Sequence, residues 1–136
     1  MGEYTEASVP EQRGRTFFVT GANTGIGYEA ARVLAGRGAR VLLGCRSEAK
    51  VRAAIDRIRA LHPEAHVEWI PLDLTSLKSV EVAARAVEQQ PRLDVLVNNA
   101  GMSPLYDSLP EVSEALWRKV IDVNLVPSPV TGTRPA

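Results

Sequence analysis

Three glycines lie within residues 20–27, which read Thr-Gly-Ala-Asn-Thr-Gly-Ile-Gly. Glycine lets a backbone approach a ligand closely, and the amides that begin a helix carry a partial positive charge. Such a segment between a strand and a helix can bind the diphosphate of a nucleotide. Tight strand-to-helix turns also need glycine, so this segment alone leaves a purely structural role open.

The identities of the residues in this loop narrow the class of nucleotide. The phosphate-binding loop of nucleoside-triphosphate hydrolases needs Gly-Lys followed by Ser or Thr, whereas this loop ends in Gly25-Ile26-Gly27. The sequence therefore disfavours such a hydrolase. Three residues separate Gly21 from Gly25, and this spacing differs from the G-x-G-x-x-G of the longer dinucleotide-binding dehydrogenases.

The segments around the loop alternate between strand and helix patterns, as expected of a parallel sheet. Short apolar runs at 17–19, 41–43, 67–70 and 93–97 predict four strands. Apolar residues at helical spacing predict the buried faces of three helices: Ile26, Ala30, Val33 and Leu34; Val51, Ala54, Ile55, Ile58 and Leu61; Leu77, Val80, Ala84 and Val87. Helix caps are predicted at Ser47 and Thr75, and a fourth helix near Glu111.

The two ends of the chain differ in composition from its centre. Residues 1–15 are polar and contain Pro10 and Gly14, so they are predicted to form a flexible leader. Residues 126–136 contain three prolines and a glycine, which excludes a regular helix and predicts a disordered tail. A single partial domain is expected over residues 16–125.

Composition limits the partners that we expect. Sixteen basic and sixteen acidic residues cancel, so the chain lacks the positive field of a nucleic-acid binder. One cysteine and two histidines, Cys45, His62 and His66, do not form a metal-binding set, and no metal site is expected. The N-terminal segment lacks the apolar run of a signal or membrane anchor, which favours a cytoplasmic protein without membrane contact.

Four motifs in the same order resemble the short-chain dehydrogenase/reductase family. They are the glycine loop at 20–27, Asp73-Leu74 after the third predicted strand, residues 98–101 (Asn-Asn-Ala-Gly) after the fourth, and Asn124. The similarity covers residues 16 to about 125. It implies an α/β fold with an incomplete Rossmann-type, doubly wound parallel sheet of about four strands and helices on both faces.

The resemblance also implies a binding site beyond the carboxyl ends of the strands, where ligands of open parallel sheets bind. The residues expected to bind the dinucleotide are Gly21, Asn23, Thr24, Gly25, Ile26, Gly27, Arg46, Asp73, Leu74, Asn99, Ala100 and Gly101. In the family, the aspartate accepts a hydrogen bond from the adenine amino group and the leucine lies against the ring. Capping of the third helix is a further role for Asp73, and both roles can coexist.

The end of the second predicted strand indicates the type of cofactor. An acidic residue there accepts from the ribose hydroxyl of NAD, whereas an arginine accommodates the 2′-phosphate of NADP. Arg46 follows Gly27 by nineteen residues, and the next acid is Glu48. The sequence therefore favours NADP(H) over NAD(H), although an exposed arginine in a loop is also an ordinary finding.

The family's catalytic residues are a serine and a Tyr-x-x-x-Lys pair, with an asparagine that Asn124 matches. None of Tyr4, Tyr28 and Tyr106 has a lysine four positions later. We therefore expect the cofactor half of an oxidoreductase for a carbonyl or secondary alcohol, inactive by itself. The alternative is a non-catalytic fragment that binds a dinucleotide or a partner, with self-association through an exposed fourth strand.

Overall fold

The structure, a computed structural model of the 136-residue chain, describes residues 2–100. The expectations for Gly101, for the helix near Glu111, for Asn124 and for residues 126–136 lie outside this range. The elements in chain order are η1 (Glu6–Ser8, a 3-10 helix), β1 (Thr16–Thr20), α1 (Gly25–Gly36), β2 (Arg40–Cys45), α2 (Glu48–Leu61), β3 (His66–Pro71), α3 (Leu77–Glu88) and β4 (Val95–Val97).

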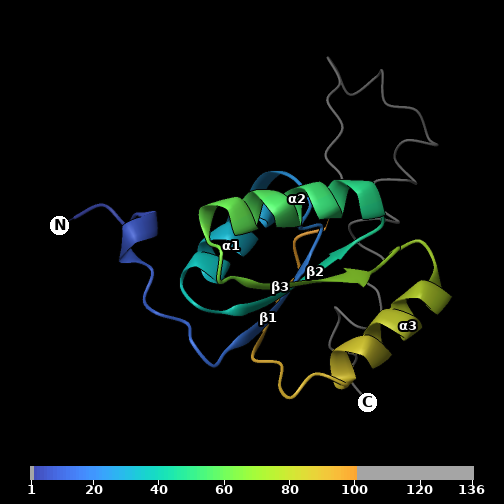
Figure 1. Ribbon diagram of the computed structural model, residues 1–136. Coiled ribbons are helices and arrows are strands. Elements are labelled where there is room, and N and C mark those ends of the chain that lie inside the picture. Colours follow the sequence, from blue (N-terminus) through green and yellow to red (C-terminus); the bar gives the residue numbers. More distant parts are fainter. Residues whose placement is uncertain (1, 101–136) are drawn as a thin grey trace, which may run out of the picture.

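The four strands are parallel and pair in the order β3-β2-β1-β4 (Figure 1). The chain moves from β1 outward to β3 and then returns to the other side of β1 to form β4. The strand order thus reverses between β1 and β4. In open α/β sheets the ligand crevice lies at such a reversal, beyond the carboxyl ends of the strands.

Successive residues of β1 point to opposite faces of the sheet and build two separate cores. Phe17 and Val19 pack with buried residues of α1 and α2, whereas Phe18 packs with those of α3. Figure 1 likewise shows α1 and α2 on one side of the sheet and α3 on the other. The predicted doubly wound α/β architecture is therefore confirmed.

The predicted helices exist, but the prediction of their buried faces was partly wrong. Three residues assigned to the core lie at helix ends and are exposed: Ile26 (83%), Leu61 (60%) and Leu77 (74%). In α1 the residues that face the sheet are Gly27, Tyr28, Ala31 and Ala35. Gly27, Ala31 and Ala35 are small and let the helix lie close to the sheet, and the buried Tyr28 ring belongs to the same face.

Two further predictions need correction. The third helix is capped by Ser76, whose hydroxyl accepts from the Ser79 amide at 3.2 Å, and not by Thr75. Thr75 instead donates to the side chain of Asp73 and completes the turn before the helix. The fourth strand is shorter than predicted, since it begins at Val95, and Leu93 remains 43% exposed. The cap predicted at Ser47 is confirmed, with a bond from the Lys50 amide.

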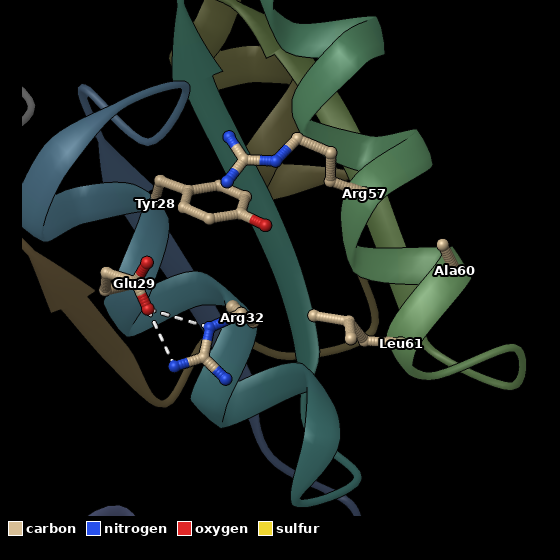
Figure 2. Close-up of a pocket in the computed structure, with 6 residues that line it drawn as sticks. All are labelled: Tyr28, Glu29, Arg32, Arg57, Ala60 and Leu61. Atoms are coloured by element: carbon tan, nitrogen blue, oxygen red, sulfur yellow. Dashed lines mark hydrogen bonds and ion pairs between the residues drawn. The ribbon is translucent and has the colours of Figure 1, made fainter.

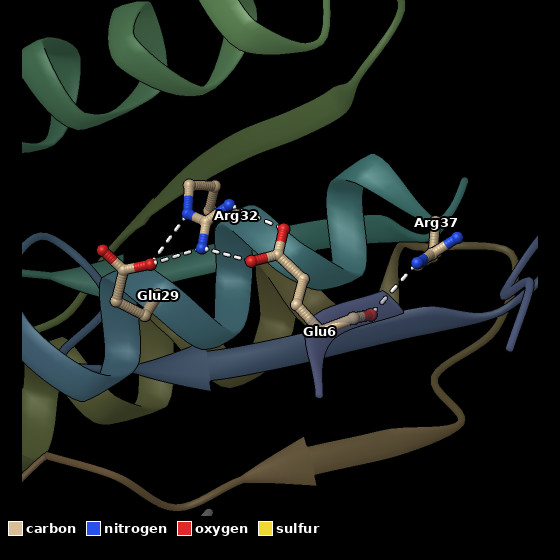
Figure 3. A network of polar contacts seen from close by, with 4 residues as sticks. All are labelled: Glu6, Glu29, Arg32 and Arg37. Carbon is tan, nitrogen blue, oxygen red and sulfur yellow. Dashed lines mark hydrogen bonds and ion pairs between the residues drawn. The ribbon is translucent and has the colours of Figure 1, made fainter. Parts of the chain in front are cut away.

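The leader contacts the first helix through a polar network that Figure 3 shows. Arg32 donates to the carboxylate of Glu6 at 2.9 and 3.0 Å and also pairs with Glu29 at 2.7 Å. Arg37 donates to the backbone oxygen of Glu6, and the backbone N–H of the buried Gln12 donates to the backbone oxygen of Arg37. The hydrogen bonds from Arg32 lower the pKa of Glu6. The flexibility of residues 1–15 stays a prediction.

The corrected face of α2 gives a matched pair of substitutions. We expect Ile58→Ala to lower the free energy of unfolding by about 2 to 5 kcal/mol, because the side chain is 0% exposed and leaves a cavity. Leu61→Ala removes as many carbons from a residue 60% exposed, and its effect should stay within about 0.5 kcal/mol. Denaturant unfolding of both variants measures the difference. Equal losses would contradict the assignment of the face.

Candidate cofactor-binding site

The buried hydroxyl of Thr20 joins the carboxyl ends of β1 and β4. It accepts hydrogen bonds from the amides of Asn99 and Ala100 at 3.1 and 3.0 Å, and it donates to the Val97 oxygen at 3.4 Å. Thr20 is 0% exposed, so these bonds satisfy a polar group inside the protein. The segment that follows β4 is thereby held beside the glycine loop.

The side chain of Asn99 then fixes the loop itself. Its Nδ2 atom donates to the backbone oxygens of Thr20 and Gly21 at 3.2 and 3.3 Å. A Cβ atom on Gly27 would lie 2.5 Å from this Nδ2 and 2.4 Å from the Gly21 oxygen. Gly27 is therefore required by a close approach between the loop and Asn99, and no larger residue fits there without a shift.

The first turn of α1 is open on the side where a ligand would approach. Gly25 has a φ of +62°, and a Cβ placed there would meet no atom of residues 2–100 within 4 Å. In the described part of the chain, the N-cap Thr24 makes no side-chain hydrogen bond to this turn, unlike the capping serines of α2 and α3. The first amides of a helix have no acceptor within the helix, so they remain available to an anion.

The exit of β2 lies beside the loop. The Gly21 amide donates to the Gly44 oxygen at 2.7 Å, and the Cys45 oxygen accepts from the Leu72 amide at 3.1 Å. Arg46 comes next and is exposed. Burial raises the pKa of the Cys45 thiol to about 11, so the thiol stays protonated at neutral pH.

Asp73 lies in the turn between β3 and α3, within electrostatic reach of Arg46. Its carboxylate accepts from the amide and hydroxyl of Thr75 at 3.0 and 2.7 Å, while its own amide donates to the Ser79 hydroxyl. The bonds from Thr75 are the main cause that lowers the pKa of Asp73, and the charge of Arg46 adds to them. Leu74 packs against the core on the α3 face.

The structure thus brings together predicted residues from the glycine loop, from the ends of β2 and β4, and from the turn after β3. Asn23 is half-buried, Thr24 and Ile26 are exposed, and Gly101 lies outside the described residues. Sequence reasoning missed Thr20 and Ser79 as supports of the site. For Thr20 the available signal was a polar residue at the end of an apolar strand, because such a residue needs a buried partner, whereas Ser79 lies within α3 and had no such signal.

A separate groove lies between α1 and α2, and Figure 2 shows its side chains. It is lined by Tyr28, Glu29, Arg32, Arg57, Ala60 and Leu61. The guanidinium of Arg57 lies 4.3 Å from the centroid of the Tyr28 ring, a distance typical of a cation–π contact. None of the predicted cofactor residues lines this groove, so it is distinct from the crevice at the strand ends.

Within residues 2–100, no three His, Cys, Asp or Glu side chains form a group that could hold a metal ion. None of the helices described here is long and apolar enough to cross a membrane.

Comparison with known proteins decides the family. Residues 15–135 match the family described as short chain dehydrogenase. The chain belongs to the short-chain dehydrogenase family. This family uses nicotinamide dinucleotides as cofactors, and the glycine loop at the carboxyl end of β1 lies where the crevice of the fold is expected.

Individual relatives agree with this assignment. The chain is 44% identical over 110 residues to a short chain dehydrogenase/reductase of Gibberella zeae, which covers 78% of this chain and 31% of that protein. It is 46% identical over 99 residues to human retinol dehydrogenase 13, with 72% of this chain and 29% of that protein covered. The chain therefore spans about a third of the length of the curated short-chain dehydrogenases that it matches.

A solved ketoreductase structure shows the same fold. Actinorhodin polyketide ketoreductase, solved with NADPH, superposes with a TM-score of 0.72 at 34% identity. The match covers 82% of this chain and 42% of the ketoreductase chain.

The residues present fit a nicotinamide dinucleotide. A diphosphate needs amide donors and room for close approach, and the first turn of α1 offers both beside Gly25. Asn99 also holds the loop by two hydrogen bonds, so binding a ligand costs little free energy for ordering the loop.

The amide of Asn99 gives the first test of this geometry. We expect Asn99→Ala to lower the free energy of unfolding by about 1 to 3 kcal/mol, because the Thr20 and Gly21 oxygens lose a donor. The matched control is Asn98→Ala, since Asn98 is the exposed neighbour and should change stability by less than about 0.5 kcal/mol. Urea unfolding measures both variants. A loss in Asn98→Ala as large as that in Asn99→Ala would argue against the bridge.

The turn at Asp73 predicts a defined dependence on pH. Folding lowers the pKa of the Asp73 carboxyl below its unfolded value of 3.8, so the ionised carboxylate stabilises the folded state. This stabilisation is complete above the unfolded pKa and is lost as the pH falls through the folded pKa. Asp73→Asn should therefore be less stable than the parent by a constant amount above about pH 5. The difference should shrink below pH 3.8. Thermal unfolding across this range checks the trend, and a difference that grows with acid would refute it.

Proposed function

We propose that this protein is an NADP(H)-dependent oxidoreductase acting on a carbonyl or a secondary alcohol, and that the described residues form its dinucleotide-binding part. The observation that carries the proposal is the first turn of α1. Its first amides have no side-chain cap, and the described residues leave open space where a Cβ of Gly25 would lie, whereas the adjoining loop is held by Asn99.

The preference for NADP(H) rests on Arg46. It is exposed directly after the buried end of β2, and no acidic residue occupies that position. A guanidinium binds a phosphate through paired hydrogen bonds and stays charged at any physiological pH. Ser47 then caps α2, so Arg46 lies in a short segment fixed at both ends. The NADPH in the ketoreductase structure is consistent with this preference.

Most of the predicted residues have a separate part in this proposal. The amides of Gly25, Ile26 and Gly27 hold the diphosphate, and Arg46 holds the 2′-phosphate. Asp73 and Leu74 bind the adenine, with Asp73 kept ionised by its bonds from Thr75. The bound nicotinamide supplies the hydride transfer. Asn99 and Ala100 border the cofactor, and Asn124 is proposed as a member of the catalytic set.

A second candidate is binding without turnover. It is favoured by the sequence, in which no tyrosine is followed four positions later by lysine. In the family, this lysine lowers the pKa of the tyrosine so that the phenol can transfer a proton near neutral pH. Because the chain is expected to be inactive by itself, we expect no NADPH oxidation by it in the presence of a panel of aldehydes and ketones. Turnover by the 136-residue chain would overturn that expectation and exclude the binding-only candidate.

Dinucleotide binding is tested by calorimetry on the 136-residue chain. We expect NADP to bind more tightly than NAD, and Arg46→Asp to reverse this order, because an acid repels the 2′-phosphate and accepts from the ribose hydroxyl. Arg52→Asp is the matched control, since Arg52 is an exposed arginine on α2 that pairs with Glu48. It should leave the preference unchanged.

Two results would count against the proposal at different levels. A folded chain that gives no heat with either dinucleotide at about millimolar concentration, where binding is worth only about 4 kcal/mol, has no such site. A chain that binds both dinucleotides but keeps its preference in Arg46→Asp does not use Arg46 for selection.

A further inference from the structure

The indole of Trp69 reaches across the sheet to the end of the neighbouring strand. In the register of β2 and β3, Trp69 lies opposite Leu43, yet its Nε1 atom donates to the backbone oxygen of Cys45 at 3.0 Å. The amide of Leu72 donates to the same oxygen at 3.1 Å. A carbonyl oxygen has two lone pairs, so this one is fully occupied by donors from β3 and the turn that follows it.

This oxygen belongs to the peptide bond that joins Cys45 to Arg46. A peptide group is planar, so two hydrogen bonds to its oxygen also restrict the orientation of the Arg46 nitrogen in the same plane. On the other edge of β2, the preceding carbonyl, that of Gly44, accepts from Gly21 in the glycine loop at 2.7 Å. The exit of β2 is thus held from both neighbouring strands.

The chain after Arg46 is also fixed. The hydroxyl of Ser47 accepts from the Lys50 amide and caps α2, which begins at Glu48. Arg46 is therefore the one residue between the held carbonyl of Cys45 and the helix cap. The direction in which the Arg46 side chain leaves the backbone depends on the held carbonyl of Cys45 and on the cap at Ser47. Among the described residues, Trp69 is the only residue of the sheet whose side chain contributes a hydrogen bond to this segment.

We propose that Trp69 is a positioning residue for cofactor selection, because its indole N–H holds the exit of β2 so that the guanidinium of Arg46 is directed to the 2′-phosphate of NADP. This inference rests on the proposed function. It assigns to Trp69 a role beyond packing against the core on the α1 and α2 face, where its ring is partly buried.

Packing and positioning predict different results for Trp69→Phe. This substitution keeps an aromatic ring in the core but removes the donor to the Cys45 oxygen. If the ring only packs, the substitution should change the affinities for ligands with and without a 2′-phosphate alike. If the indole positions Arg46, the substitution should change only the affinity for the ligand that Arg46 binds.

The test uses the full 136-residue chain and two probes, adenosine 2′,5′-bisphosphate and adenosine 5′-monophosphate, which differ by the 2′-phosphate. We expect calorimetry to show that Trp69→Phe weakens binding of the bisphosphate about threefold to tenfold, the range of one hydrogen bond, and leaves the monophosphate unchanged. In an Arg46→Ala background, Trp69→Phe should have no further effect on the bisphosphate, because the two residues act through one contact.

Two controls address stability. Ile70→Val alters the next residue of β3, which lies in the opposite core, and it should leave the ratio of the two affinities unchanged. Replacing Trp69 by benzothienylalanine, in which sulfur takes the place of the indole N–H, keeps the ring shape if Trp69→Phe folds poorly. This replacement should weaken binding of the bisphosphate as much as Trp69→Phe does.

The outcomes separate this inference from the proposed function. A parent chain that binds neither probe nor either dinucleotide overturns both. A parent that prefers the bisphosphate through Arg46, while both Trp69 replacements keep that preference, overturns the positioning role alone. Equal weakening of the two probes also overturns it, because packing alone accounts for that result.

Discussion

The contact between Asn99 and the glycine loop is the constraint on which the candidate site depends. The amide of Asn99 bonds two successive carbonyl oxygens of the loop, and the Thr20 hydroxyl brings Asn99 to this place. The contact leaves no room for a side chain at Gly27. Since the loop is held from the side of β4, the first turn of α1 stays free toward the ligand. Strand pairing and the proposed phosphate binding thus depend on one arrangement.

Much of the fold could be predicted because strands buried on both faces consist of continuous apolar runs. Residues 17–19 and 41–43 belong to central strands, and these strands are buried almost throughout. Helix faces were harder to predict. Periodicity shows which residues share a face but not where contact with the sheet ends, and Leu61 and Leu77 lie at that limit. In α1 the choice of face depends on close packing of small residues, which hydrophobicity alone does not reveal.

The candidate site also has parts that the sequence predicts and parts that it does not. The glycine loop, Arg46 and Asp73 could be located from the sequence because each lies in a motif next to a strand end. Their supports could not. The bonds from Asn99 to the loop join residues almost eighty positions apart, and that between Trp69 and Cys45 depends on the register of two strands. Spacing along the chain carries no information about such partners, which only the folded sheet brings together.

The leader is attached to the half of α1 that lies away from the glycine loop. Glu6 bonds Arg32 and Arg37, and Gln12 bonds Arg37, near the carboxyl end of the helix. Arg37, the C-cap residue of α1, also lies where positive charge interacts favourably with the helix dipole. An expression fragment cut at Thr16, the first residue of the sheet, would lose these tethers although it retains every strand and every predicted cofactor residue. A natural boundary for truncation therefore lies ahead of Glu6, not at the start of β1.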